Sequence, residues 1–169
     1  MRYLSGTQAQ EAWAYIELAA IVAQDSTCHR SQCGSIIVKN ELIIGKGYNS
    51  PPGGERIDEC FKDKLPPSFK SDRTCCMHAE ERAVMDALRN HADKIEGSRL
   101  YFIRLSGEGK PVQAGLPYCT ICSKMTLEAK VGEFVLWHEQ GICVYNTTEY
   151  NELSFLYGGN GSDWKGRTL

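Results

Sequence analysis

The first half of the chain carries two different hydrophobic patterns. Over residues 8–24 the apolar side chains recur at helical spacing, which predicts an amphipathic helix entered through a capping box at residues 7–10. Its apolar positions are Trp13, Ile16, Ala20 and Ala23. Residues 34–39 and 42–47 are shorter apolar runs on either side of Asn40-Glu41, so they predict a β-hairpin.

The second half of the chain alternates predicted helices with predicted strands. Apolar spacing predicts helices over 78–91, 119–130 and 147–156, and strands over 100–103, 133–137 and 142–145. A strand–helix–strand order favours parallel pairing through a right-handed crossover, whereas the hairpin adds an antiparallel edge. We therefore expect an α/β fold with three layers, α/β/α, around one mixed five-stranded sheet.

A long irregular segment separates the two halves. Residues 48–77 contain two Pro-Pro pairs and a Gly-Gly pair, so no single regular element fits them. A loop of this length inside a compact domain is usually functional or held in place by something. We expect residues 1–157 to form a single domain and the glycine-rich residues 158–169 to form a flexible C-terminal tail.

Composition and charge narrow the class of protein. The 169 residues carry a formal net charge of -2, which argues against tight binding to long nucleic acids, because cationic contacts to phosphate supply most of that affinity. The longest aliphatic run, residues 18–23, is too short to span a membrane. Polar Gln8, Gln10 and Glu11 interrupt the place where a signal peptide would need an apolar core. We expect a cytoplasmic protein.

Eight cysteines are many for a reducing compartment, where clustered thiols are more often metal ligands than disulfides. Cys33 and Cys143 lie in apolar surroundings, so we expect them to be small core residues. The other six lie in predicted loops or near predicted helix starts, where ligands usually lie. They are Cys28, Cys60, Cys75, Cys76, Cys119 and Cys122.

Two predicted helices begin with potential zinc ligands. His78 opens one, and Cys119 and Cys122 open the other. Three such donors make a zinc site with room for an exchangeable fourth ligand, and helix N-termini also stabilise thiolates. Glu80 follows His78 closely enough to carry a proton at the same point. Taken separately, the cysteine pair is equally a structural zinc knuckle, and His78-x-Glu80 is an ordinary surface helix start.

Together the two motifs match the signature His-x-Glu…Pro-Cys-x-x-Cys, and the chain resembles the zinc nucleobase deaminases over residues 8–145. It departs from that signature at Tyr118, which stands between Pro117 and Cys119. The likeness is closest to the deoxycytidylate (dCMP) deaminases. It lies in residues 34–38, 43–54 and 78–80, although Ser50 replaces a glycine and Arg82 an asparagine of the usual pattern.

This resemblance implies a cytidine-deaminase-like fold and a zinc-dependent hydrolase that converts dCMP to dUMP and ammonia. It implies that His78, Cys119 and Cys122 hold the catalytic zinc and that Glu80 carries the protons. Asn49 is implied in contact with the nucleotide sugar. The expected substrate-binding residues are Asn49, Ala79, Arg30, Ser31 and Arg82. Solvated positions are the alternative for the two arginines, and a turn asparagine is the alternative for Asn49. Trp137 and His138 are candidates to flank the base, and core packing is the alternative for Trp137.

Some phage-type dCMP deaminases look similar around residues 24–28 and carry a structural zinc between this loop and the long irregular one. The resemblance therefore implies a second zinc held by Cys28, Cys60, Cys75 and Cys76, with His29 as a reserve ligand. Such a metal would explain how residues 48–77 stay ordered. The alternative is four unpaired thiols in loops.

Other functions remain open at this point. One is deamination of another small nucleoside or base, and a second is deamination of bases in tRNA or single-stranded DNA, which the net charge disfavours. A third is a zinc-stabilised binding module, although structural zinc usually has four protein ligands. The resemblance further implies a homo-oligomer, from dimer to hexamer, with dCTP as activator and dTTP as inhibitor, and no membrane partner.

Overall fold

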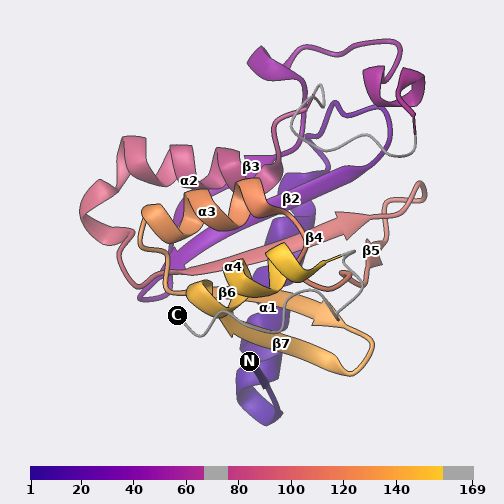
Figure 1. Cartoon of the computed structure of the whole chain (residues 1–169). Coiled ribbons are helices and arrows are strands. Elements are labelled where there is room, and N and C mark those ends of the chain that lie inside the picture. Colours follow the sequence, from indigo (N-terminus) through magenta and orange to yellow (C-terminus); the bar gives the residue numbers. More distant parts are fainter. Residues whose placement is uncertain (67–75, 158–169) are drawn as a thin grey trace.

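One mixed sheet runs through the centre of the molecule, in a computed structural model that describes residues 1–66 and 76–157 (Figure 1). Its strand order is β1-β7-β6-β4-β2-β3, and β5 pairs with β4 outside this path. The strands are β1 (Arg2–Tyr3), β2 (Gln32–Lys39), β3 (Leu42–Tyr48), β4 (Arg99–Leu105), β5 (Pro111–Val112), β6 (Glu133–His138) and β7 (Gly141–Asn146). The five expected strands are present, and the two-residue strands β1 and β5 raise the sheet to seven, because backbone pairing rather than an apolar run defines them.

The strand pairing follows the order of the elements along the chain. β2 and β3 form the predicted hairpin, and Asn40 and Glu41 at its turn have φ of 48° and 64°, the left-handed pair that suits a two-residue connection. β4 and β6 pair in parallel, as the intervening helix predicts, and β6 and β7 pair antiparallel. The mixed character of the sheet is therefore confirmed.

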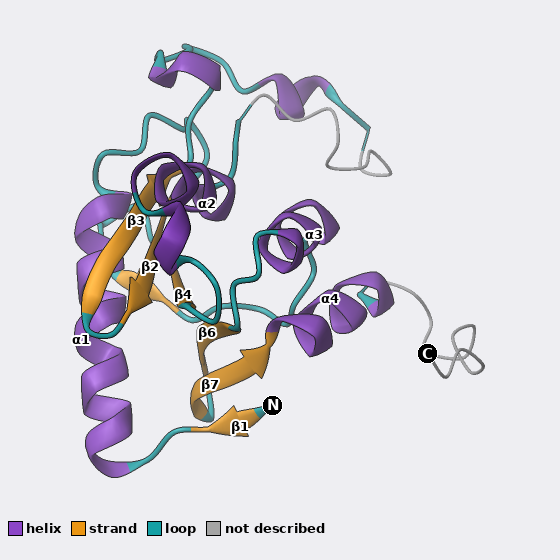
Figure 2. Cartoon of the chain, turned by 90° about the vertical axis from the view of Figure 1, so that its left-hand side faces the viewer, coloured by secondary structure: helices purple, strands orange, loops and turns teal. Residues whose placement is uncertain are grey.

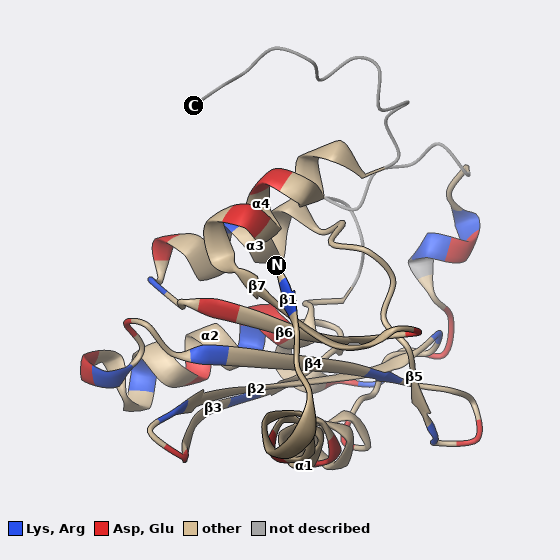
Figure 3. Ribbon diagram, turned by 90° about the horizontal axis from the view of Figure 1, so that it is seen from below, with Lys and Arg blue, Asp and Glu red and all other residues tan. Residues whose placement is uncertain are grey.

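Helices cover both faces of this sheet. They are α1 (Gly6–Ala23), α2 (Ala79–Asn90), α3 (Thr120–Glu128) and α4 (Thr147–Leu156). Figures 2 and 3 show α1 alone on one face and the other three helices on the opposite face, which confirms the three-layer α/β/α arrangement. The expected capping box is wrong, because α1 already begins at Gly6 after Ser5, and Thr7 lies inside its first turn. None of the helices in the described part of the chain has the length and apolar character to cross a membrane.

Alternate residues of the central strands fill two cores, one on each face. Ile36 points toward α1, whereas its neighbour Ile37 points toward α2, as the period of a strand requires. The core on the α2 side includes Phe134 stacked on Tyr150 of α4, with ring centroids 3.8 Å apart. Cys143 is fully buried in the same core, so its predicted role is confirmed.

The irregular segment that separates the halves holds only short 3-10 turns in its described part, at Pro52–Gly54 and Phe61–Lys64, and another such turn follows α2 at Ala92–Lys94. The tail expected at residues 158–169 lies outside the described residues. In Figure 1 the described parts of the segment between β3 and α2 extend beyond one end of the sheet, beside the start of α2.

Three glycines allow helices to pack directly on the hairpin. A Cβ on Gly34 would lie 2.0 Å from the carbonyl oxygen of Ala19 in α1. A Cβ on Gly45 or Gly47 would lie 2.4 Å or 2.2 Å from backbone oxygens of α2. Because no side chain fits at these contacts, glycine sets how closely α1 and α2 approach the strands.

We expect Gly34→Ala to lower the free energy of unfolding by about 1–3 kcal/mol, because the added methyl group has to displace α1 from β2. Urea unfolding followed by circular dichroism measures this change. The control is Gly107→Ala, where a Cβ meets nothing within 4 Å among the described residues. Equal stability of the two variants would contradict the close packing of α1.

Candidate metal centre and substrate cavity

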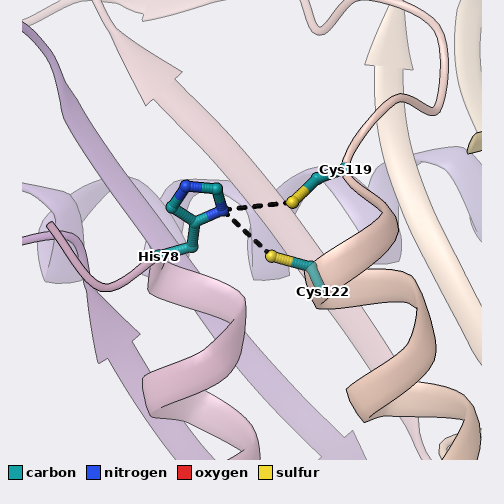
Figure 4. A group of neighbouring side chains, drawn as sticks. All are labelled: His78, Cys119 and Cys122. Atoms are coloured by element: carbon teal, nitrogen blue, oxygen red, sulfur yellow. Dashed lines mark hydrogen bonds between the residues drawn. The ribbon is translucent and has the colours of Figure 1, made fainter. Parts of the chain in front are cut away.

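The three predicted metal donors lie at two helix starts. His78 is the residue before α2, and its N–H donates to the Glu81 carboxylate at 2.7 Å, which closes the first turn of that helix. Cys119 is the residue before α3, and Cys122 lies in its first turn. Figure 4 shows the His78 ring from one helix directed at the two sulfur atoms of the other.

The geometry of these donors fits a zinc ion. The Nδ1 atom of His78 lies 3.1 Å from the Cys122 Sγ and 3.3 Å from the Cys119 Sγ (Figure 4). Tetrahedral zinc with one nitrogen and two sulfur ligands places such donors about 3.5 Å apart. Within the described residues the cluster has three protein donors, the number typical of catalytic rather than structural zinc.

The charges of the cluster suit a cation as well. The hydrogen bond with Cys122, together with the hydrogen bond to His78, lowers the pKa of Cys119 to about 4. The hydrogen bond to Cys119 raises the pKa of His78 to about 9, and the same thiol pair raises the pKa of Cys122. The cluster therefore already contains a thiolate, and a divalent cation that binds there replaces protons.

Glu80 lies in the first turn of α2 with only 7% of its surface exposed. Burial raises its pKa to about 7, partly opposed by the nearby charge of His78. A carboxyl group with this pKa can both hold and release a proton near neutral pH.

A cavity of about 400 Å³ opens beside this cluster. Most of the residues predicted from the sequence line it: Cys28, Arg30, Ser31, Asn49, Cys60, Cys76, His78, Ala79 and Glu80. Cys75 lies outside the described residues. The structure thus brings together the metal cluster, the loop after α1 and part of the long irregular segment.

The Asn49 side chain is already engaged in this wall. Its Oδ1 accepts hydrogen bonds from the N–H of Cys33 and the hydroxyl of Ser26, both at 2.7 Å, and its Nδ2 donates to the carbonyl of Ser31 at 2.9 Å. These three bonds attach the residue that follows β3 to the loop after α1 and to the start of β2. One N–H of the amide remains for a ligand.

Three residues that we expected near the substrate, Arg82, Trp137 and His138, are not among the described residues that line the cavity. The guanidinium of Arg82 bonds to Ser50 and Pro51 instead. Trp137 packs edge-on against Trp13 of α1. His138 is buried, and its Nδ1 donates to the carbonyl of Ala114 while its Nε2 accepts from the Tyr145 hydroxyl.

The cavity also contains residues that the sequence reasoning missed. The prediction that Cys33 is a core residue is wrong, because its side chain is half-buried and lines the cavity. Burial raises the pKa of its thiol to about 12. Phe102 and Arg104 line it from β4. A strand prediction extended to residue 105 finds both, because alternate positions face the same side. No periodic pattern in the sequence indicates that Lys62 and Tyr118 line the cavity.

A zinc centre at two helix starts of an α/β/α domain is the arrangement of a zinc-dependent deaminase. A family model, described as the cytidine and deoxycytidylate deaminase zinc-binding region, matches residues 9–138. This match covers most of the chain and includes His78, Glu80, Cys119 and Cys122. The chain therefore belongs to this family of zinc-binding deaminases.

Individual relatives agree with the family. A deoxycytidylate deaminase of Saccharomyces cerevisiae is 27% identical over 122 residues, which cover 69% of this chain but 32% of that protein. The one from Mycobacterium phage D29 is 29% identical over 98 residues, 53% of this chain and 74% of that protein. The chain thus spans about a third of the length of the yeast relative.

The fold also matches a solved structure. The crystal structure of dCMP deaminase from the cyanophage S-TIM5, in complex with dCMP and dUMP, superposes with a TM-score of 0.54 at 26% identity. The superposition covers 78% of this chain and 82% of the cyanophage protein. The expected cytidine-deaminase-like fold is therefore confirmed.

Proposed function

We propose that residues 1–157 form a single deaminase domain that hydrolyses a free cytosine nucleotide, dCMP, to dUMP and ammonia. The observation that carries this proposal is the buried carboxyl of Glu80, which lines the same cavity as His78 of the His78–Cys119–Cys122 cluster. A cavity of about 400 Å³ is in the size range of small-ligand sites. The similar cyanophage enzyme was solved with dCMP and dUMP, which supports this substrate.

His78, Cys119 and Cys122 would hold the zinc ion. When bound, zinc acts as a Lewis acid that lowers the pKa of a coordinated water to about 7 and so supplies a nucleophile at neutral pH. Glu80 would accept a proton from the attacking water and give it to the ring nitrogen. It would then take the proton of the new C4 hydroxyl and give it to the leaving amino group. One C–O bond forms and one C–N bond breaks at C4, so cytosine and water become uracil and ammonia.

Cationic side chains favour a nucleotide over a nucleoside. Arg30, Lys62 and Arg104 line the cavity from three different segments. Arg30 also pairs with Asp63 at 3.3 Å, which positions its guanidinium at the rim. Ser31 adds a hydroxyl donor beside them. Such a group of donors suits a phosphate monoester, and one remaining N–H of Asn49 suits a sugar hydroxyl.

We further propose a second, structural zinc. Cys28 comes from the loop after α1, whereas Cys60 and Cys76 come from the long irregular segment, and all three line the same cavity. With Cys75, which lies outside the described residues, they make the four thiol donors typical of structural zinc. His29, the reserve ligand, is exposed at the end of the loop. A metal at these thiols would join the loop after α1 to the long segment before α2.

The protein is further proposed to act in the cytoplasm as a homo-oligomer, with dCTP as activator and dTTP as inhibitor. Exposed apolar side chains on two helices support self-association: Leu18 and Ile21 on α1, and Met85 and Leu88 on α2. Adding each effector to the activity assays below tests the regulatory part of this proposal.

Glu80→Gln should lower turnover of dCMP by about a hundredfold or more, because the amide cannot carry protons, while the zinc content stays that of the wild type. Ammonia release from dCMP measures turnover, and the exposed Glu128→Gln is the matched control. The same assay with cytosine, adenine and guanine compounds, with and without phosphate, tests the substrate. Wild-type turnover in Glu80→Gln would contradict the mechanism, and turnover of another base but not of dCMP would contradict the substrate.

Arg104→Ala should raise the KM for dCMP about tenfold or more, because a hydrogen bond to a charged phosphate is lost. The kinetics with deoxycytidine, which lacks the phosphate, should stay unchanged. Steady-state kinetics with both substrates measure this difference, and the exposed Arg89→Ala serves as control. An equal loss with both substrates would argue against phosphate binding at Arg104.

Metal analysis tests the two zinc sites together. The wild type should hold about two equivalents of zinc per chain, and His78→Ala and Cys60→Ser should each retain about one. Cys143→Ala, which alters a buried core cysteine, should retain both. Elemental analysis after dialysis against metal-free buffer gives these values. A single equivalent in the wild type that Cys60→Ser leaves in place would exclude the second zinc.

A further inference from the structure

Arg82 makes a charged contact that the chemistry proposed above does not use. It lies one turn after His78 in α2, and its Nη2 atom donates to the Ser50 hydroxyl at 2.6 Å and to the Pro51 carbonyl at 2.9 Å. Its guanidinium also lies over the Tyr48 ring, 5.5 Å from the centroid. Its Nε is buried and has no hydrogen-bond partner among the described residues, so the two hydrogen bonds of Nη2 fix the position of this side chain.

Glycine makes this contact possible. A Cβ on Gly47 would lie 2.2 Å from the Ala79 carbonyl and 2.8 Å from the Arg82 Cβ. The first turn of α2 therefore lies directly on the end of β3. From there the Arg82 side chain reaches the turn that follows the strand.

The same turn is tied to the metal-binding helix start by its backbone. Ser50 and Met77 form an isolated antiparallel bridge, in which Ser50 N–H donates to the Met77 carbonyl at 3.3 Å and Met77 N–H donates to the Ser50 carbonyl at 2.9 Å. His78 follows Met77 directly, and the N–H of Arg82 donates to the His78 carbonyl. Ser50, Met77, His78 and Arg82 thus form a closed ring of contacts.

The cavity wall continues from this ring. Asn49 precedes Ser50 and lines the cavity. It holds the loop after α1 through Ser26 and Ser31, and the start of β2 through Cys33. Ser50 is fully buried, so its hydroxyl has no access to bulk water as a substitute partner for Arg82. Any change at Arg82 therefore reaches the cavity through Ser50 and Asn49.

We propose that Arg82 is a positioning residue: through Ser50 and Pro51 it fixes Asn49, and with it one wall of the nucleotide cavity, relative to His78. Ser50 and Arg82, two positions at which the chain departs from the dCMP deaminase pattern that it resembles, contact each other in the structure. We call this contact the Arg82–Ser50 clamp. Its kinetic consequence rests on the proposed function, whereas its structural consequence does not.

Hydrogen exchange tests the clamp without any turnover. The amides of Asn49, Ser50 and Met77 are hydrogen-bonded within or beside the bridge, and their exchange is measured in the zinc-loaded protein. Arg82→Gln should speed their exchange about tenfold or more, because a charge-assisted hydrogen bond is lost, and should leave the amides in the middle of β2 unchanged. The matched control is Arg89→Gln, an exposed arginine two turns further along α2.

Kinetics and a double variant test the positioning role. Arg82→Gln should raise the KM for dCMP about tenfold and change kcat less than about twofold, at unchanged zinc content, because the wall moves and the metal cluster does not. Ser50→Ala should have a smaller effect of the same kind. The KM of the double variant should be no higher than that of Arg82→Gln alone, because both changes remove the same contact.

Two results would overturn the clamp. One is unchanged exchange at Asn49, Ser50 and Met77 in Arg82→Gln; if dCMP turnover persists, this leaves the proposed function intact. The other is an equal acceleration throughout β2, which indicates a general loss of stability instead of local positioning. If exchange changes as expected but neither the wild type nor any variant deaminates dCMP, the clamp stands and the proposed function fails.

Discussion

The site depends on two helix N-termini that begin side by side at one edge of the sheet. Each helix start carries partial positive charge from unpaired N–H groups, so bringing two together is electrostatically unfavourable unless negative groups lie between them. Here the Cys119 thiolate and the carboxylate of Glu81 supply that charge. The negatively charged side chains that stabilise the helix starts are therefore also the kind of side chain that binds a metal ion.

The sequence predicts the parts of this arrangement that local spacing controls. The hairpin, the helices and the ligands His78, Cys119 and Cys122 follow from periodicity and from one motif at each helix start. The short strands β1 and β5 were missed, because two residues have no period, and they form only when a distant strand offers an edge. Their addition changes the count of strands and leaves the layers as predicted.

Side-chain direction was the harder part to predict. Cys33 lies before an apolar run and looks like a core residue, yet it is at the end of β2 that meets the cavity. Arg82 lies on the correct face of α2 for a substrate contact, but the glycines of β3 bring the helix so close that its side chain meets Ser50 first. Both outcomes depend on how two distant elements pack, which a single sequence pattern does not contain.

The distribution of charge in the cavity bears on how a nucleotide would orient itself. Two thiolates from Cys119 and Cys122 offset the two positive charges of zinc, and Glu80 adds a carboxyl, so a loaded metal centre has little attraction for a phosphate. The cations Arg30, Lys62 and Arg104 carry the positive charge of the cavity lining. In the proposed reaction with dCMP, a phosphate bound at these cations leaves the neutral base to enter the metal end. The rigidity of the wall between the two ends then decides whether C4 of the base lies within reach of Glu80, and Asn49 and the Arg82–Ser50 clamp belong to that wall.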